Sequence, residues 1–384
     1  MLHVMMIITA AFAADVVAIE PDAKTGRSLA VVVPGGALVH TAQLVPLGPS
    51  VAPTPPSDQV RQAFTRLDDV LKSEQSSLAQ AVKINVYVSH PSISELVDQE
   101  LATRFAGKTP PAVSFVQTRL PNPAVMVALD AVARTDQPTP GVRRSELRRG
   151  NDLTRTAVLP DGPAVYISGQ AEKGDGTLAD ATKQTMASLL TTLRFLELTA
   201  HDVVHVKAFL TPMSESSMAL QEILAAFPEK LPVPVSLVEW ESTSPIEIEL
   251  VASAKPQASA PRVEYITPPG MTASPVFCRV VRVNVPQRIY VSGLFGTKDP
   301  DSADEVRDLF ATLKRATEAA GSDLKHLAKA TYYVSDDGVS KLLNDLRPEF
   351  YDRHVPPAAS KAKVVGTGRA GRTITMDMIA VPKE

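Results

Sequence analysis

The sequence predicts an α+β protein built from three tandem units that share the element order ββαβαββ. A first observation is a repeated apolar strand that contains Ser-Gly just before its last residue in its two clearest copies. The copies are Val165–Gln170, Ile289–Leu294 and, more faintly, Leu38–Gln43. A second observation is a nearly constant spacing, because apolar helix positions recur from Phe64 to Met186 and on to Phe310. Self-similarity at a fixed interval is typical of repeated structural units.

Within each unit the elements follow from the period of the apolar residues. Alternation predicts strands at 83–88 and 330–334, and helical spacing of apolar residues predicts a helix over 306–317. The first helix of a unit begins beside turn or capping residues, at Ser57-Asp58 and Asp301-Ser302. A segment that contains proline precedes the penultimate strand of each unit, at Pro110-Pro111, Pro232 and Pro356-Pro357.

The units are placed at 25–133, 152–254 and 270–384, and the first is the most divergent. The segments 134–151 and 255–269 between them are rich in proline and charge, so we expect polar linkers that form no core. A sheet with two helices on one face needs cover on the other face. Three such sheets would cover one another by closing around a pseudo-threefold axis.

Composition places the chain among ordinary globular proteins. It has 384 residues, of which 44% are hydrophobic and 21% are charged. The formal net charge of −3 provides no overall field that would hold a polyphosphate, so we expect no nucleic-acid partner. Beyond the amino terminus no stretch is long and apolar enough to cross a bilayer, so no membrane association is expected.

The amino terminus, residues 1–14, resembles a possible signal peptide. An apolar run, Val4-Met5-Met6-Ile7-Ile8, precedes the small residues of Ala11-Phe12-Ala13, which suit a cleavage site. This pattern predicts a periplasmic or secreted protein. The alternative is a buried first strand in a cytoplasmic protein, because the segment has no Lys or Arg before the apolar run. The single cysteine, Cys278, excludes an intramolecular disulfide.

The repeated pattern resembles the Rid family of reactive-intermediate deaminases, also called the YjgF type and often labelled endoribonuclease L-PSP. The resemblance is most specific in the second unit, at 166–170, in the helix from about Thr177, and in the strands 205–211 and 246–249. It implies a YjgF/chorismate-mutase-like fold, which family members usually assemble as homotrimers. This chain would then be a monomeric pseudo-trimer with three non-identical clefts, which bind a small molecule without a cofactor.

The resemblance implies an arginine that grips the substrate carboxylate and a glutamate that assists water in each cleft. A guanidinium pairs bidentately with a carboxylate, and a partly buried acid positions or protonates a reacting group. The arginine position falls on Val113, Val235 and Ala359, so the deaminase activity does not simply carry over. The glutamate position is kept only as Glu247 and becomes Ala128 and Thr375 elsewhere. The alternative for Glu247 is a solvated residue of a half-exposed strand.

Four further residues are candidates for substrate binding. Asn344 retains an asparagine of the family's second helix, which falls on Asp98 and Leu220 in the other units, and it is alternatively an exposed helical residue. Lys361 shares a strand face with Ala359 and would replace the missing arginine, unless it is merely a solvated edge residue. Gly169 and Gly293 lie inside strands, where a ligand or the packing between units approaches the backbone closely.

Other chemistries find no support in the sequence. The seven histidines form no metal-binding motif, and His201 and His205 straddle a loop and a strand, so no metal site is expected. The glycine-rich run 366–371 lies between two strands and is interpreted as a hairpin connection. Cys278 lies in an apolar strand and is interpreted as packing rather than as a nucleophile.

Two function classes therefore remain open. One is an enzyme, a 2-iminobutanoate/2-iminopropanoate deaminase-like hydrolase that uses Glu247 or Lys361 in one cleft. The other is a non-catalytic metabolite-binding or scaffolding protein that has lost the arginine. The ribonuclease label of the family is disfavoured by the charge balance and by the absence of an acid-base pair at fixed spacing.

Overall fold

The computed structural model describes residues 15–46, 54–150 and 152–384. The predicted signal peptide, 1–14, lies outside this range and stays a prediction. The first third of the chain forms β1 (Val17–Asp22), β2 (Arg27–Val33), β3 (Ala37–Thr41), α1 (Pro56–Ser73), β4 (Ala81–Val88), α2 (Ile93–Arg104), β5 (Ala112–Gln117) and β6 (Val127–Thr135). The second third forms β7 (Arg143–Arg149), β8 (Asp152–Leu159), β9 (Ala164–Gln170), α3 (Leu178–Phe195), β10 (Val203–Leu210), α4 (Ser216–Ala225), β11 (Val235–Glu239) and β12 (Ile246–Ser253).

The last third repeats this order. It forms β13 (Val263–Ile266), β14 (Val280–Val283), β15 (Arg288–Leu294), α5 (Ala303–Ala319), β16 (Leu327–Val334), α6 (Asp337–Phe350), β17 (Ala358–Lys363) and β18 (Ile374–Ala380). Each third is thus a ββαβαββ arrangement preceded by one extra strand. The mixed α+β fold class predicted from the sequence is confirmed.

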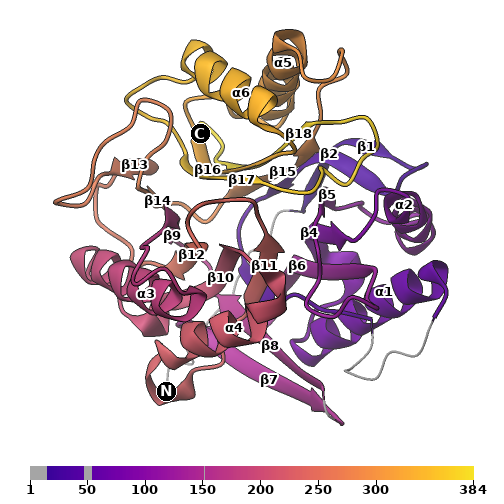
Figure 1. Ribbon diagram of the computed structural model, residues 1–384, viewed down its shortest axis with the longest axis horizontal. Helices are drawn as coiled ribbons and strands as arrows, with labels where there is room; N and C mark the ends of the chain where they lie inside the picture. The colour runs from indigo at the N-terminus through magenta and orange to yellow at the C-terminus, as the bar shows by residue number, and fades with distance from the viewer. Residues whose placement is uncertain (1–14, 47–53, 151) are drawn as a thin grey trace, which may run out of the picture.

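We divide each third into a hairpin and a body. The hairpins are β1-β2, β7-β8 and β13-β14. Bodies 1, 2 and 3 run from β3 to β6, from β9 to β12 and from β15 to β18. In Figure 1 each body contributes one pair of helices to the periphery, and the strands lie between these pairs.

Each hairpin pairs with the body of a different third of the chain. Hairpin β1-β2 pairs through β2 with β15, hairpin β7-β8 through β8 with β3, and hairpin β13-β14 through β14 with β9. The strand orders are therefore β5-β4-β6-β3-β8-β7, β11-β10-β12-β9-β14-β13 and β17-β16-β18-β15-β2-β1. One residue pair, Ser28 with Ala112, joins the first and the third of these into a single larger sheet.

The prediction that residues 134–151 and 255–269 are linkers is therefore wrong in part. Residues 143–149 of the first segment form β7, and residues 263–266 of the second form β13, and both strands lie at sheet edges. Their side chains are mostly half-buried or exposed, which is why their composition resembles that of a linker. A strand at an edge tolerates polar and charged residues because one side of it is open to solvent.

The faint first copy of the repeated strand is also shifted by one residue from its predicted alignment. The equivalent pairs Asn85-Asp130, Lys207-Glu249 and Thr331-Asp377 fix the closing strands relative to one another. His40 then pairs with Val132 where Tyr166 pairs with Val251, and Tyr290 pairs with Ile379. His40, and not Val39, takes the place of Tyr166. A shift by one residue exchanges the two faces of a strand, so the correction changes which side chains face the centre.

Burial of apolar residues explains where the helices lie. Helix α1 buries Val60, Phe64, Leu67 and Leu71 against its sheet, and α5 buries Val306, Phe310 and Leu313 in the same way. The Ser302 hydroxyl caps α5 by accepting a hydrogen bond from the Glu305 amide at 3.0 Å, whereas Pro55 before α1 provides no such cap. None of the helices in the described ranges is long and apolar enough to cross a membrane.

The faces of the sheets opposite the helices meet at the centre of the molecule. Apolar residues of all three bodies and of the hairpins pack there, among them Val31, Val82, Tyr166, Val204 and Tyr290. Charged residues lie beside them in pairs. Lys83 contacts Asp377 at 2.6 Å, and Lys329 contacts Glu249 at 2.7 Å. These buried pairs connect different bodies, so the interior is specified by polar as well as apolar contacts.

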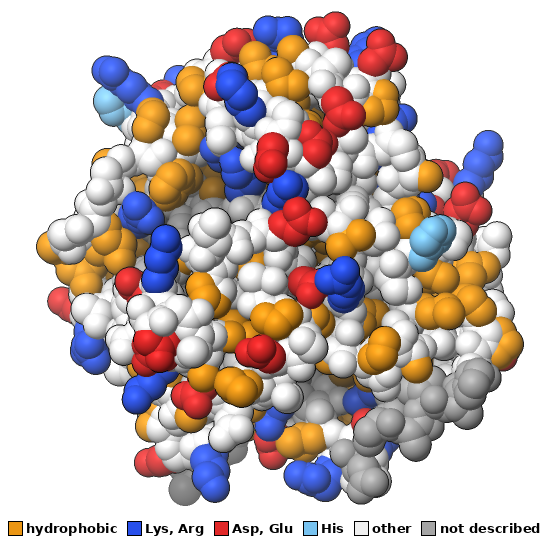
Figure 2. Space-filling view, viewed as in Figure 1, with side chains coloured by type: hydrophobic (Ala, Val, Ile, Leu, Met, Phe, Trp, Pro, Cys, Tyr) orange, Lys and Arg blue, Asp and Glu red, His pale blue; other side chains and the backbone are white. Residues whose placement is uncertain are grey.

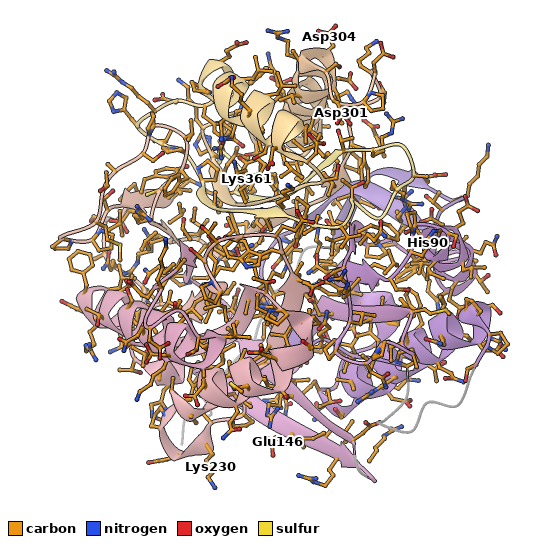
Figure 3. All side chains as sticks on the ribbon, viewed as in Figure 1. His90, Glu146, Lys230, Asp301, Asp304 and Lys361 are labelled. Atoms are coloured by element: carbon orange, nitrogen blue, oxygen red, sulfur yellow. The ribbon has the colours of Figure 1, made fainter. Side chains whose placement is uncertain are left out.

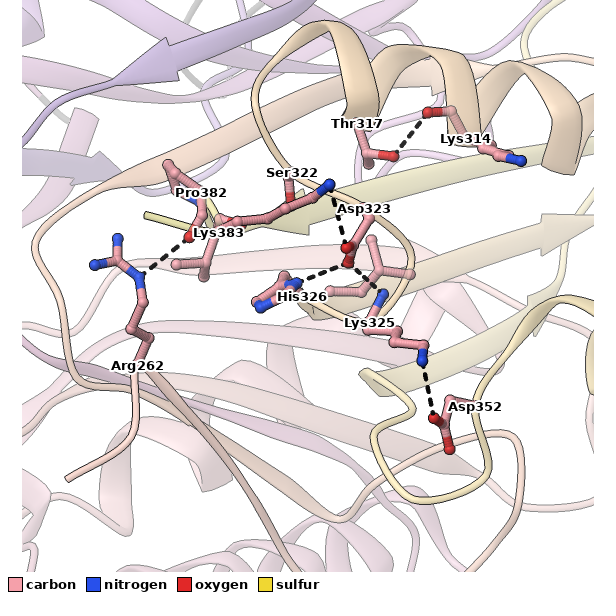
Figure 4. A network of polar contacts seen from close by, with 12 residues as sticks. Arg262, Lys314, Thr317, Ser322, Asp323, Lys325, His326, Asp352, Pro382 and Lys383 are labelled. Carbon is pink, nitrogen blue, oxygen red and sulfur yellow. Dashed lines mark hydrogen bonds and ion pairs between the residues drawn. The ribbon is translucent and has the colours of Figure 1, made fainter.

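The carboxyl terminus is tied to the same assembly. Figure 4 shows Asp323 accepting from the amide of Lys325 at 2.8 Å and contacting His326 and, at 3.5 Å, Lys383. Arg262, which precedes β13, donates to the carbonyl of Pro382 at 3.2 Å. The hairpin that pairs with body 2 is thus also held by the end of body 3.

Candidate functional site

A pocket of about 640 Å³ lies between bodies 2 and 3, and we call it the 2–3 cleft. Body 2 supplies Gly169 at the end of β9 and Glu247 on β12, and body 3 supplies β17 and α6. The segment that leads into β14 forms a further wall with Phe277 and Arg279. A volume of this size is typical of small-molecule sites.

Glu247 lies at the second position of β12, opposite Phe209 of β10. Burial raises the pKa of its carboxyl to about 7, with a smaller raising effect from the nearby Glu249. A hydrogen bond from Ser360 and the positive charges of Arg279 and Lys361 act in the opposite direction. A carboxyl group with a pKa near 7 exists in both protonation states at neutral pH, as an acid-base catalyst requires.

Gly169 leaves the space that the Glu247 carboxyl occupies. A Cβ atom added to residue 169 would lie 2.0 Å from Oε1 of Glu247, far inside van der Waals contact. The amide of Gly169 donates to the Ser360 hydroxyl at 3.2 Å, which ties body 2 to body 3 at the same point. The close approach predicted for this glycine is therefore made by Glu247 itself.

Lys361 and Arg347 form a pair of cations on the body 3 side of the cleft. Lys361 on β17 donates to Oδ1 of Asn344 at 3.1 Å and to the Ser340 hydroxyl at 2.9 Å. Arg347, one helical turn beyond Asn344 on α6, donates to the same Oδ1 at 2.7 Å. Figure 3 labels Lys361 in this region, and Figure 2 shows Lys and Arg side chains gathered there. One neutral amide oxygen thus holds two positive charges together.

Arg279 provides a third cation from a different segment. Its Nε donates to the carbonyl of Thr272 at 3.1 Å, and its guanidinium lies 4.9 Å from the centre of the Phe277 ring. Its backbone carbonyl accepts from the amide of Ser168 at 2.9 Å, which fixes this segment alongside β9. The Thr272 carbonyl and the Phe277 ring therefore position the guanidinium, and the bond to Ser168 fixes the backbone that carries it.

The corresponding cleft between bodies 3 and 1, the 3–1 cleft, is closed by ion pairs. Asp98, at the position of Asn344, contacts Arg27 at 3.1 Å and Arg369 at 2.8 Å. The Arg369 guanidinium lies 4.0 Å from the centre of the Phe115 ring. Gly293, the counterpart of Gly169, faces Ser114 of body 1, where an added Cβ would meet Cα at 3.0 Å. Close packing between bodies therefore accounts for this glycine.

The 1–2 cleft, between bodies 1 and 2, is closed by backbone and side-chain contacts. Gln43 takes the position of Gly169, and its Nε2 donates to the carbonyl of Leu237 at 3.0 Å. Its amide donates to the carbonyl of Val235 at 3.1 Å. Ala128, at the position of Glu247, is fully buried in an apolar cluster with Phe209 and other residues. The polar pocket is thus confined to the 2–3 cleft among these three positions.

The structure brings four of the five predicted site residues together, namely Gly169, Glu247, Asn344 and Lys361. It places Gly293 in the closed 3–1 cleft instead. Arg347 and Arg279 were not predicted. The spacing of Asn344 and Arg347 on one helix would have indicated Arg347, because residues three apart share a helix face. No comparable signal exists for Arg279, because a hairpin from elsewhere in the chain brings it to the cleft.

Two other predictions concern metals and cysteine. Within the described ranges, no group of three or more His, Cys, Asp or Glu side chains is arranged to hold a metal ion. Cys278 is buried, and burial raises the pKa of its thiol. Its sulfur lies 3.1 Å from the carbonyl of Val280 and 3.3 Å from that of Ile266. A thiol in these surroundings is a packing group rather than a nucleophile.

Comparison with known proteins shows which family part of the chain is similar to. Residues 20–135 match the family model described as Endoribonuclease L-PSP. The match covers β2 and body 1, the unit that the sequence predicts to be the most divergent. No curated protein matches the chain.

Several solved structures are similar to parts of the chain. They include a conserved Rid family protein, YyfB, from Yersinia pestis, with 24% identity, a TM-score of 0.29, and coverage of 32% of this chain and 99% of that one. A YjgF family member from Neisseria meningitidis has 20% identity, a TM-score of 0.25, and coverage of 32% and 96%. The YjgF gene product of E. coli has 25% identity, a TM-score of 0.23, and coverage of 24% and 80%.

Proposed function

We propose that the chain is a fused assembly of three Rid-type units and that its 2–3 cleft hydrolyses a small imine or enamine that carries a carboxylate. The observation that carries this proposal is the Glu247 carboxyl, which has a pKa of about 7 and lines the same pocket of about 640 Å³ as three cationic side chains. A small anion would be held by the cations while the carboxyl transfers protons.

 In this proposal Lys361 and Arg347 bind the substrate carboxylate in place of the arginine that the resemblance implies. Ala359 stands at that position and offers only a methyl group to the cleft. The neutral Glu247 carboxyl donates its proton to the imine nitrogen, and the resulting carboxylate accepts a proton from the attacking water. The water oxygen bonds to the imine carbon, which gives a carbinolamine and restores the proton on Glu247. Glu247 then donates this proton to the amine nitrogen and accepts the proton of the new hydroxyl group as the carbon–nitrogen bond breaks, so the products are a carbonyl compound and ammonia.

The closed 1–2 and 3–1 clefts support different roles for the three clefts. In this proposal they hold the bodies together, and only the 2–3 cleft binds a ligand. The exchanged hairpins support a monomeric pseudo-trimer, because each sheet is completed within the same chain. The Arg27-Asp98-Arg369 contacts would then act as a structural counterpart of the binding site.

The test is hydrolysis of freshly generated amino-acid imines by the full chain, with semicarbazide trapping the imine that remains. We expect acceleration that falls at least tenfold in Glu247→Gln and in Lys361→Ala. Lys363→Ala is the matched control, because Lys363 lies on the same face of β17 but pairs with Glu241 and Asp337 outside the pocket. No acceleration with small, acidic and aromatic imines would reject the enzyme and leave a metabolite-binding protein.

A second expected result concerns Gly169. Gly169→Ala should lower imine hydrolysis at least tenfold, because the added methyl group occupies the place of the Glu247 carboxyl. The free energy of unfolding should change by only about 1 kcal/mol, since the displaced group is the mobile end of a side chain. Steady-state kinetics and denaturant unfolding measure the two quantities. Gly293→Ala is the control at the equivalent position of the closed 3–1 cleft, and equal loss of hydrolysis in both variants would contradict the assignment.

A further inference from the structure

We infer that the 2–3 cleft is specific for a molecule with two anionic groups, such as a 2-imino dicarboxylate and the 2-oxo dicarboxylate formed from it. This inference rests on the proposed function of the same cleft and extends it to the class of substrate. It concerns the number of negative charges that the cleft binds. A substrate with one carboxylate would leave part of the positive charge of the cleft without a partner.

The cleft holds three cations that have no carboxylate partner. In the part of the chain that the structure describes, no ion pair is formed by Lys361, Arg347 or Arg279. Arg347 is 7% exposed, and its Nε has no hydrogen-bond partner among the described residues. A buried guanidinium group normally has each of its donors satisfied. The unpaired donor and the excess positive charge both indicate an anionic ligand.

The 3–1 cleft provides an internal comparison. Its counterpart of Asn344 is Asp98, whose carboxylate contacts the two arginines Arg27 and Arg369. That carboxylate neutralises the cations of the closed cleft from within the chain. In the 2–3 cleft the amide of Asn344 still orients Lys361 and Arg347 but carries no charge. The neutral residue thus keeps the cations in position and leaves their charge for a ligand.

The cations form two separate positions. Lys361 and Arg347 share the Asn344 oxygen and belong to β17 and α6 of body 3. Arg279 belongs to the segment before β14 and is held by the Thr272 carbonyl and the Phe277 ring. Both Arg279 and Lys361 act electrostatically on Glu247, so both positions lie near its carboxyl group. A substrate with one carboxylate at each position would present its reacting carbon to Glu247.

Isothermal titration calorimetry of the full chain with 2-oxoglutarate and with 2-oxobutanoate tests this inference. We expect 2-oxoglutarate to bind at least tenfold more tightly. Arg279→Gln should bring the two dissociation constants within about twofold of each other, because only the second carboxylate loses its partner. Asn344→Asp should weaken binding of both compounds at least tenfold, since it introduces the charge that Asp98 carries in the closed cleft. Lys363→Ala should leave both dissociation constants unchanged.

Equal affinities for the two compounds, absence of binding, or a preference that survives Arg279→Gln would overturn the inference. Circular dichroism of each variant verifies that the fold is retained. Hydrolysis of monocarboxylate imines without any preference for 2-oxoglutarate would leave the proposed function intact and reject only the dianion. A preference for 2-oxoglutarate without imine hydrolysis would do the reverse.

Discussion

Lys83→Met is expected to lower the free energy of unfolding by about 3–5 kcal/mol, the usual cost of removing one partner of a buried ion pair. Lys83 is 3% exposed, and its ammonium donates to Asp377 at 2.6 Å, to the Ser114 hydroxyl at 2.6 Å and to the carbonyl of Val291 at 2.7 Å. Methionine preserves the length of the side chain. The loss therefore arises from leaving the Asp377 carboxylate buried without its counterion.

Denaturant unfolding measures this loss, and a second substitution identifies its cause. Lys83→Met combined with Asp377→Leu should recover most of the stability, because neither charge of this pair is then left buried without its partner. Lys341→Met is the exposed control, since the Lys341-Asp345 pair lies at the surface and contributes at most about 1 kcal/mol. A loss below about 1 kcal/mol in Lys83→Met would show that the ion pair does not stabilise the contact between bodies 1 and 3.

A pH-dependent loss of stability that originates at Glu247 is the second large expected effect. The pKa of this carboxyl is about 7 in the folded protein, against an ordinary value of 4.5. Between these two values the unfolded chain has released the proton while the folded chain still binds it. Stability therefore falls as the pH rises, because the unfolded state binds fewer protons. The contribution is fully present below about pH 4.5 and is lost as the pH rises through about 7.

The difference in unfolding free energy between the wild type and Glu247→Gln isolates this contribution. Between pH 4.5 and pH 8 the wild type should lose about 2–3 kcal/mol of unfolding free energy relative to Glu247→Gln, since one pKa unit corresponds to about 1.4 kcal/mol. Denaturant unfolding at a series of pH values measures the difference. A difference that is independent of pH would mean that Glu247 titrates normally and would remove the basis for its role as an acid.

Part of the candidate site could be predicted from the sequence. The resemblance to the Rid family predicts Glu247 and Asn344, the period of a strand predicts Lys361, and all three line one pocket. The chain segments that carry them are strand and helix positions with a regular spacing, so their faces follow from the period of each element. Arg279 was missed because its place in the cleft depends on a hairpin that pairs with a distant strand.

The fold likewise has features that the sequence predicts and features that only the tertiary structure shows. Local apolar periodicity predicted the order ββαβαββ, which recurs in each third of the chain, and the face that each helix buries, because these depend on neighbouring residues in the chain. The exchange of hairpins was decided only in the tertiary structure, since any antiparallel edge strand of suitable register offers the same backbone hydrogen bonds. The alignment of His40 with Tyr166 likewise required the observed strand pairs.

The sequence by itself predicted the α+β class, which the structure confirms, and it determined that a carboxylate stands at the position of Glu247 in the second predicted unit alone. Only the tertiary structure decided which of the three clefts is open. Asp98 closes one cleft by pairing with Arg27 and Arg369, and Gln43 closes another by bonding to the backbone of β11. Each of these contacts joins residues that are far apart in the chain. Their outcome depends on charge and shape complementarity between surfaces, which no local pattern encodes.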